Sequence, residues 1–263
     1  MAVQFTKQKL LAEKINFLTI IDAARLSEIL VKTNEDTLVV FDVDMVLLNT
    51  KEIAFQIPNL DLHNDIVLEI KSRYTQEEFD YLVHCALVQI EFELLHPLMS
   101  VMVNGLQDRN VPTMACTALL SGLIELKYDM MEWRTNQLAE FGIDFSKTAP
   151  DESGFKMLSF PTYRGNVPEY NKGVMITNSE HSLTDKGMVL ASLLSIMPEM
   201  PKKIVMIDDK LKNLEDVGNS LAQLGYGGDY LAIEFLAAKY VHCPLLSANE
   251  FKSEFQRLLV DQL

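Results

Sequence analysis

The segment 41–47 contains two aspartates, Asp42 and Asp44, which follow an apolar run and are two positions apart. In an extended segment, residues i and i+2 point to the same side, so both carboxylates are expected to face one pocket at a strand end. Like charges this close are costly unless a shared proton or a divalent cation lies between them. The spacing predicts a hydrolytic or phosphoryl-transfer site. The alternative is a turn or surface loop with solvated or amide-capping side chains.

A second acidic pair, Asp208 and Asp209, follows another apolar run at residues 204–207. In open α/β sheets, chemistry gathers at the carboxyl ends of strands, which is where both acidic pairs are expected. Thr117 ends a further short apolar stretch, and Lys186 opens a predicted helix. The alternation of strands and helices allows all of these groups to meet at one edge of a sheet.

The segments that must position these groups alternate between strand and helix patterns, which indicates an α/β fold with a parallel sheet. Residues 10–30 are expected to form one or two amphipathic helices, with Asp22 as an N-cap. Gly142 suits a left-handed helix C-cap. Strands are predicted at 38–41, 111–117, 173–177, 204–207 and 230–235. Helices are predicted at 129–141, 186–194, 211–224 and 248–263.

Residues 51–110 have a different pattern, because apolar positions recur at helical spacing between residues 76 and 98. We therefore expect a helical insertion over 51–110 within an α/β core formed by 1–50 and 111–263. Residues 150–172 are rich in Pro, Gly, Ser and aromatic residues and have no helical period. They are expected to form a loop or a small hairpin that acts as a second flap.

The amino-acid composition limits the kinds of molecule that the protein is expected to bind. A chain of 263 residues can build one substantial core with an insertion, and its 48% hydrophobic and 23% charged residues are ordinary for a globular protein. The net charge of -14 argues against nucleic-acid binding and against anionic membranes. We find no cleavable signal and no membrane-spanning run, so a cytoplasmic location is expected, although export without such a signal leaves no trace in a sequence.

The three cysteines, Cys85, Cys116 and Cys243, are widely spaced and form no CxxC pair, which favours reduced thiols. Cys116 lies in an apolar run and is interpreted as a small buried hydrophobic residue, with a catalytic role as the alternative. The five histidines show no metal-binding spacing, which argues against a zinc site. Nothing in the sequence indicates an oligomeric state.

The order and flanks of these groups resemble the haloacid dehalogenase-like (HAD) hydrolase superfamily. Asp42-Val43-Asp44-Met45-Val46 is similar to its first motif and Met114-Ala115-Cys116-Thr117 to its second; Asp185-Lys186-Gly187 is similar to the third and Ile207-Asp208-Asp209 to the fourth. Residues 142–145 and 201–210 resemble an uncharacterised bacterial, acid-phosphatase-like branch. The resemblance implies a Rossmann-like parallel sheet flanked by helices, with residues 51–110 as a helical cap over the active site.

The resemblance also implies catalytic roles. Phosphoryl transfer needs an in-line nucleophile and neutralisation of the phosphoryl charge. Asp42 would be the nucleophile that forms an aspartyl-phosphate, and Asp44 would protonate the leaving oxygen and later activate water. Thr117 would bind a phosphoryl oxygen, and Lys186 would offset negative charge. The structural alternatives are that Thr117 satisfies backbone groups and that Lys186 is a solvated residue at a helix start.

The implied cofactor is Mg²⁺, a hard cation suited to oxygen ligands. Asp42, Asp208 and the backbone carbonyl of Asp44 would hold it. Asp209 would be a direct or water-mediated ligand, or would orient its neighbours. The structural alternative for Asp209 is an N-cap for the helix that follows.

The leading hypothesis is a Mg²⁺-dependent phosphatase that hydrolyses a small phosphomonoester, because a dehalogenase would not need the second acid, Asp44. The alternative is a catalytically weak HAD-like domain that binds a partner protein as an effector module, which the acidic surface and the 150–172 segment motivate. The substrate does not follow from the sequence. Candidate contacts for an anionic substrate, each with a solvated position as the alternative, are Lys71, Arg73, His84, Tyr163 and Arg164.

Overall fold

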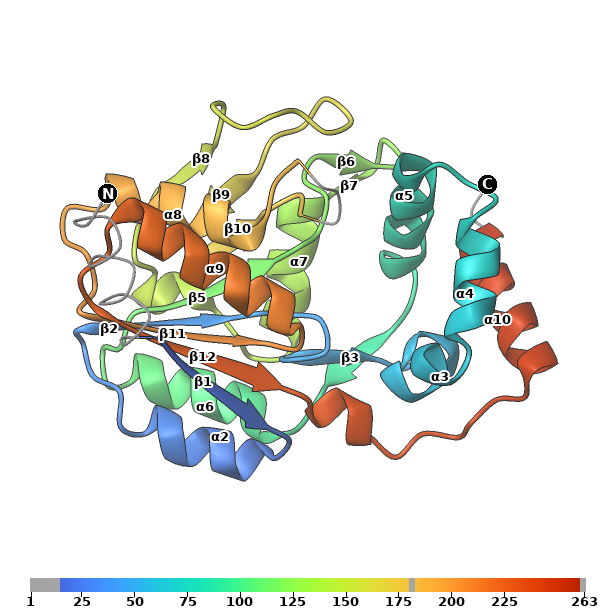
Figure 1. The fold of residues 1–263 in the computed structure, drawn as a ribbon, viewed down its shortest axis with the longest axis horizontal. Coiled ribbons are helices and arrows are strands. Elements are labelled where there is room, and N and C mark those ends of the chain that lie inside the picture. Colours follow the sequence, from blue (N-terminus) through green and yellow to red (C-terminus); the bar gives the residue numbers. More distant parts are fainter. Residues whose placement is uncertain (1–14, 180–182, 261–263) are drawn as a thin grey trace, which may run out of the picture.

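A computed structural model describes residues 15–179 and 183–260. An eight-stranded sheet lies at its centre, in the order β1-β12-β11-β2-β5-β10-β9-β8 (Figure 1). Neighbouring strands from β1 to β10 pair in parallel, whereas β9 and β8 pair antiparallel at one edge. The strands are β1 Ile15–Ile20, β2 Thr37–Phe41, β5 Thr113–Thr117, β8 Gly154–Lys156, β9 Glu169–Asn171, β10 Val174–Ile176, β11 Lys203–Asp208 and β12 Asp229–Phe235.

Helices cover both faces of the sheet. Alternate residues of β2 point into two separate apolar cores: Val39 and Phe41 into one, Leu38 and Val40 into the other. A strand that is buried on both faces is expected to be a continuous apolar run, which is how this strand was predicted. The expected α/β class with a mostly parallel sheet flanked by helices is confirmed. The first core is covered by α2 (Ala23–Leu30), α6 (Leu98–Gln107) and α7 (Met130–Glu140), and the second by α8 (Lys186–Ile196) and α9 (Leu211–Leu224).

The strand order makes the junction between β2 and β11 a topological switch point. From β2 the chain proceeds to β5 and β10 on one side, and then returns to β11 on the other side of β2. Phe41 pairs with Ile207, so the residues that follow them, Asp42 and Asp208, emerge side by side. In open α/β sheets, the crevice that binds ligands lies outside the carboxyl ends of the strands at such a point.

Beside the sheet lies a second group of helices, which we call the helical lobe (Figure 1). An antiparallel ribbon of β3 (Leu48–Thr50) and β4 (Phe92–Leu94) connects it to the sheet. The lobe has its own apolar cluster, in which the ring centroid of Phe255 lies 5.2 Å from that of Phe55. The lobe consists of the 3-10 turn η1 (Ile53–Phe55), α3 (Ile57–Leu62), α4 (Asn64–Lys71), α5 (Gln76–Leu87) and α10 (Ala248–Val260).

The helical lobe differs from the insertion expected over residues 51–110. Helix α6 packs on α2 against the sheet, so the inserted part of the lobe lies between β3 and β4. Helix α10, which was expected to belong to the core, packs on α4 and α5 instead. The apolar side of α10 would suit any hydrophobic partner, so its pattern predicts a buried stripe without identifying the surface that buries it.

The N-terminal part of the described chain also differs from expectation. Residues 15–20 form β1, an edge strand paired with β12, instead of a helix. The pattern of this segment is compatible with both structures, and pairing with the sheet decides between them. The expected N-cap is confirmed, because the side chain of Asp22 accepts a hydrogen bond from the Arg25 N–H. The expectations for residues 1–14 and 261–263 lie outside the described residues.

Residues 150–172 contain β8 and β9, and we call this segment the 150–172 hairpin. Its tip reaches the helical lobe, where the hydroxyl of Tyr163 donates a hydrogen bond of 3.0 Å to Asp80. The guanidinium of Arg164 lies 4.1 Å from the Tyr81 ring centroid and pairs with Glu77 at 3.3 Å. The hairpin therefore connects the edge of the sheet to α5.

None of the helices within residues 15–179 and 183–260 is both long enough and apolar enough to cross a membrane.

The packing of α10 predicts that Leu259→Ala destabilises the protein. Leu259 is fully buried in the cluster of the helical lobe, and removing a buried leucine side chain costs about 2–5 kcal/mol. Urea unfolding monitored by circular dichroism measures the change in the free energy of unfolding. Leu62→Ala, at a position of the same lobe that is 53% exposed, is the matched control and is expected to change it by less than about 1 kcal/mol. Equal effects of the two substitutions would contradict the packing of α10.

Candidate functional site

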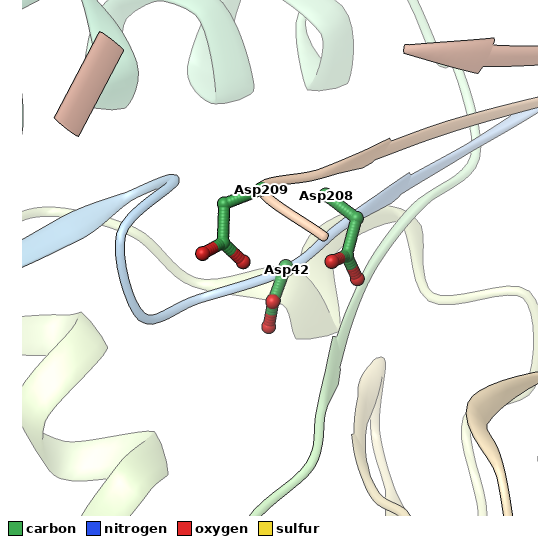
Figure 2. A group of neighbouring side chains, drawn as sticks. All are labelled: Asp42, Asp208 and Asp209. Carbon is green, nitrogen blue, oxygen red and sulfur yellow. The ribbon is translucent and has the colours of Figure 1, made fainter. Parts of the chain in front are cut away.

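Three carboxyl groups gather where β2 and β11 end (Figure 2). The backbone N–H of Asp42 donates a hydrogen bond of 2.8 Å to the carbonyl of Ile207, which holds the two strand ends together. One carboxylate oxygen from each of Asp42, Asp208 and Asp209 lies within 4.8 Å of the other two. Asp208 is fully buried, and Asp42 is almost fully buried. The structure thus brings together the two acidic pairs that are 166 residues apart in sequence (208 − 42).

A buried lysine lies between two of these carboxylates. The Lys186 ammonium is 2.8 Å from Asp42 and 2.7 Å from Asp208, and its side chain is fully buried. Helix α8 starts at this residue, after the N-cap Asp185. The next residue must be small, because a Cβ at Gly187 would collide with the backbone carbonyl of Asp216 in α9. The alternative of a solvated lysine at the helix start is therefore wrong.

The remaining oxygens of the buried carboxylates accept hydrogen bonds from nearby amides. Asp42 Oδ1 accepts from the backbone N–H of Val43 at 2.7 Å. Asp208 Oδ1 accepts from the backbone N–H of Lys210 and from the Asn213 side chain, both at 2.9 Å. Sequence analysis missed Asn213, although an asparagine in the first turn of the helix after an acidic pair was an available signal.

Asp209 does not cap helix α9. The N-cap position is Lys210, and no side chain makes a capping hydrogen bond there. The Asp209 side chain lines a cavity beside Asp42 instead. The capping alternative for Asp209 is therefore wrong.

Burial shifts the pKa values of these groups. Burial raises the pKa of Asp42 well above its ordinary value; Lys186 opposes this shift, and the carboxylates of Asp208 and Asp209 add to it. Burial alone would lower the pKa of Lys186, but Asp208 and Asp42 reverse that effect and keep the lysine protonated. Burial raises the pKa of Asp209 to about 6. Lys210 and Lys186 oppose the shift of the Asp209 pKa, so the nearby lysines do not fully offset the effects of burial and of the neighbouring carboxylates.

Asp44 has a partner of its own, which sequence analysis missed. Arg134 Nη2 lies 2.9 and 2.7 Å from the two carboxylate oxygens of Asp44. Arg134 is fully buried, and its guanidinium also donates to Gln137 and lies 4.7 Å from the Trp133 ring centroid. A single arginine in helix α7, 90 residues after Asp44, gives no local signal of this pairing. Arg134 therefore fixes the orientation of the Asp44 carboxyl group beside the three-carboxylate cluster.

A cavity of about 350 Å³ separates the carboxyl edge of the sheet from the helical lobe. Asp42, Asp44, Thr117 and Asp209 line it from the side of the sheet, whereas Lys186 and Asp208 lie beneath the lining. Thr117 also pairs with Ile176 of β10, and its backbone carbonyl accepts a hydrogen bond from the hydroxyl of Thr177, the residue after β10. Asp42 and Asp44 therefore face one pocket, as their spacing predicted.

The candidate substrate contacts fall into two groups. Lys71 and His84 line the cavity. Arg73 pairs with Glu69 at the surface and is not part of the lining. Tyr163 and Arg164 contact helix α5, as described above, and are not among the lining residues.

A larger and more open depression of about 720 Å³ lies along helix α7. It contains none of the three converging carboxylates, and one of its acids, Glu91, is paired with Lys51 at 2.9 Å. We place the candidate site at the smaller cavity, because buried titratable groups converge there.

The three cysteines are free thiols, and none lines the 350 Å³ cavity. Burial raises the pKa of Cys116 to about 12, so its thiol stays protonated. This agrees with the interpretation of Cys116 as a small buried hydrophobic residue, since the thiolate is the reactive form.

Fold and site together define an α/β protein with an acidic centre at the carboxyl edge of its sheet. The chain belongs to the family described as "Protein of unknown function (DUF2608)", which matches residues 20–261 and so includes every residue of the acidic centre. A protein of Rickettsia prowazekii (strain Madrid E), described as uncharacterized, is 22% identical over 217 residues, which cover 82% of this chain and 75% of that protein. No solved structure matches the chain.

The pKa of Asp209 predicts a stability change with pH. Its folded-state value of about 6 lies above the ordinary value of 3.8, so the folded protein binds the proton more tightly. This contribution to stability is present below about pH 4 and is lost as pH rises through 6. Asp209→Asn is therefore expected to stabilise the metal-free protein at pH 7 by up to about 3 kcal/mol, with little effect at pH 4.

Urea unfolding in EDTA between pH 4 and pH 8 measures this difference. Asp229→Asn, at an exposed position in β12, removes one negative charge without removing a buried carboxylate and is the control. A constant difference between Asp209→Asn and the unsubstituted protein at all pH values would contradict the assignment.

Proposed function

We propose that this protein is a Mg²⁺-dependent phosphatase of the HAD type, which hydrolyses a small phosphomonoester through an aspartyl-phosphate on Asp42. The observation that carries the proposal is the buried Asp42–Lys186–Asp208 arrangement at the topological switch point, with Asp209 beside it. Three of the four sequence motifs that resemble that superfamily supply these residues, and the second motif supplies Thr117 in the lining of the same cavity. On this proposal the helical lobe is the cap over the active site.

The donor set fits a magnesium ion. Asp42, Asp208 and Asp209 carry three negative charges when ionised, and Lys186 supplies one positive charge, which leaves a charge of -2 for a divalent cation to balance. Carboxylate oxygens are the ligands that Mg²⁺ prefers. These three side chains, with the backbone carbonyl of Asp44, would hold the ion. When bound, it would neutralise charge on the phosphoryl oxygens.

The catalytic roles proposed for these side chains are those that the resemblance to the superfamily implies. Asp42 would attack the phosphorus atom, and Asp44 would give a proton to the leaving oxygen as the P–O bond breaks. Asp44 would then take a proton from the water that cleaves the aspartyl-phosphate, which restores both carboxyl groups. Lys186 would offset the charge of Asp42 and of the phosphoryl group, and Thr117 would donate a hydrogen bond to a phosphoryl oxygen.

The proposed nucleophile gives the first test. Asp42→Asn is expected to lower turnover of para-nitrophenyl phosphate at least about 1,000-fold, because the amide cannot form the acyl phosphate. EDTA is expected to abolish turnover by the unsubstituted protein, and added Mg²⁺ to restore it. Release of para-nitrophenol is measured by absorbance, with Asp36→Asn, at an exposed surface position, as the control.

Full activity of Asp42→Asn would rule out the nucleophile. Calorimetric Mg²⁺ binding with no turnover across a broad panel of phosphomonoesters would favour the alternative, a catalytically weak domain that binds a partner protein.

Arg134 gives the second test. Arg134→Met removes the group that fixes the Asp44 carboxylate, and a misplaced catalytic group can cost about 100-fold in rate. We expect kcat for para-nitrophenyl phosphate to fall by about 10- to 100-fold, while KM changes much less, because Arg134 does not line the cavity.

Arg109→Met is the matched control, since Arg109 also makes several structural hydrogen bonds, to the carbonyls of Leu30, Val31 and Thr33, away from the site. Circular dichroism verifies that both variants are folded. An unchanged kcat in folded Arg134→Met would show that Asp44 needs no such support.

A further inference from the structure

The wall of the cavity that faces the acidic centre comes from helix α5, which presents two neighbouring rows of side chains. Phe79, Val83 and Leu87 form one row, with the spacing of four residues that places side chains on one side of a helix. Gln76, Asp80 and His84 form the other row. The first row is apolar and the second is polar. The surface that a ligand would meet therefore depends on the hydrogen bonds that the polar row already makes within the protein.

The polar row is already engaged in hydrogen bonds within the protein. Asp80 accepts one from Gln76 at 2.5 Å and one from the Tyr163 hydroxyl at 3.0 Å. His84 Nδ1 donates to the Asp80 carbonyl at 2.7 Å, and its Nε2 accepts from the Leu120 backbone N–H at 2.9 Å. These groups hold α5 to the 150–172 hairpin and to the loop after β5.

Helices α3 and α4 complete the wall on the lobe side. Helix α3 adds Ile57 and Leu60. Lys71 is the cation that the helical lobe contributes to the lining, and its ammonium lies 5.5 Å from the Phe79 ring centroid. On the opposite side the lining carries Lys210 together with Asp42, Asp44 and Asp209, so a second phosphate would enter a cavity whose acidic groups outnumber its two lysines.

We infer that the substrate is a phosphate monoester with a single phosphate and a compact apolar leaving group, of the class of benzyl or cyclohexylmethyl phosphate. This inference rests on the proposed phosphatase function and specifies its substrate class. The phosphate lies at the acidic centre, and the apolar part contacts Phe79, Val83 and Leu87. Sugar and polyol phosphates are disfavoured, because hydroxyl groups buried against the apolar row of α5 would have no hydrogen-bond partner there. The cavity volume of about 350 Å³ fits such a small molecule.

The test compares cyclohexylmethyl phosphate with glucose 6-phosphate and fructose 1,6-bisphosphate in the presence of Mg²⁺. Cyclohexylmethyl phosphate and glucose 6-phosphate are both primary alkyl phosphates on a six-membered ring, so they differ mainly in the polarity of the leaving group. We expect kcat/KM for cyclohexylmethyl phosphate to exceed that for either sugar phosphate by about 100-fold or more. Release of inorganic phosphate is measured, with the Asp42→Asn protein as the blank.

Leu87→Asn places a polar group in the apolar row and is expected to lower the kcat/KM ratio of cyclohexylmethyl phosphate to glucose 6-phosphate at least about 10-fold. Because both substrates are assayed on one preparation, the ratio does not depend on the fraction of folded protein. Leu68→Asn, at a position of α4 that is 56% exposed, is the control and should leave the ratio unchanged.

Mg²⁺-dependent and Asp42-dependent hydrolysis with equal or greater preference for the sugar phosphates would overturn the inference and leave the proposed function standing. An unchanged ratio in Leu87→Asn would also overturn it. No hydrolysis of any of the three compounds, or of para-nitrophenyl phosphate, would overturn the inference and the proposed function together.

Discussion

The buried ammonium group of Lys186, held between Asp42 and Asp208, is the interaction on which the rest of the site depends. An isolated buried carboxylate costs several kcal/mol, so neither aspartate could occupy its strand end without a positive partner. The contact joins β2, β11 and the start of α8. It also requires α8 to approach α9 closely, which only a glycine at position 187 allows.

Lys186 offsets only part of the negative charge of the carboxylate cluster, and the excess negative charge is what distinguishes the site. Burial raises the pKa values of Asp42 and Asp209, and the neighbouring carboxylates add to both shifts, which Lys186 and, at Asp209, also Lys210 only partly oppose. Asp44 is separate from this imbalance, since it has its own buried partner in Arg134. The arrangement divides the acidic residues into a cluster with unbalanced negative charge and a separate carboxyl group that an arginine holds. A divalent cation would complete the first, while the second is held in a fixed orientation.

In the helical lobe, polar side chains in the cavity wall also hold the lobe in place. Asp80 and His84 lie at the cavity but are engaged with the 150–172 hairpin and with the backbone after β5. These contacts hold α5 over the acidic centre, where its apolar and polar rows both line the cavity. Helix α10 strengthens the same lobe from the other end of the chain, since Phe255 and Leu259 complete its apolar cluster.

The sequence by itself determined the central strands, because a strand buried on both faces must be a continuous apolar run, as at 38–41 and 204–207. It also indicated Asp42, Asp44, Asp208 and Asp209, because charged residues directly after such runs require a function or a partner. Only the tertiary structure decided that residues 15–20 pair as an edge strand, that α10 joins the helical lobe and that Arg134 holds Asp44. These are contacts between segments far apart in the chain, and local periodicity describes which face of an element is apolar or charged without specifying the surface it meets.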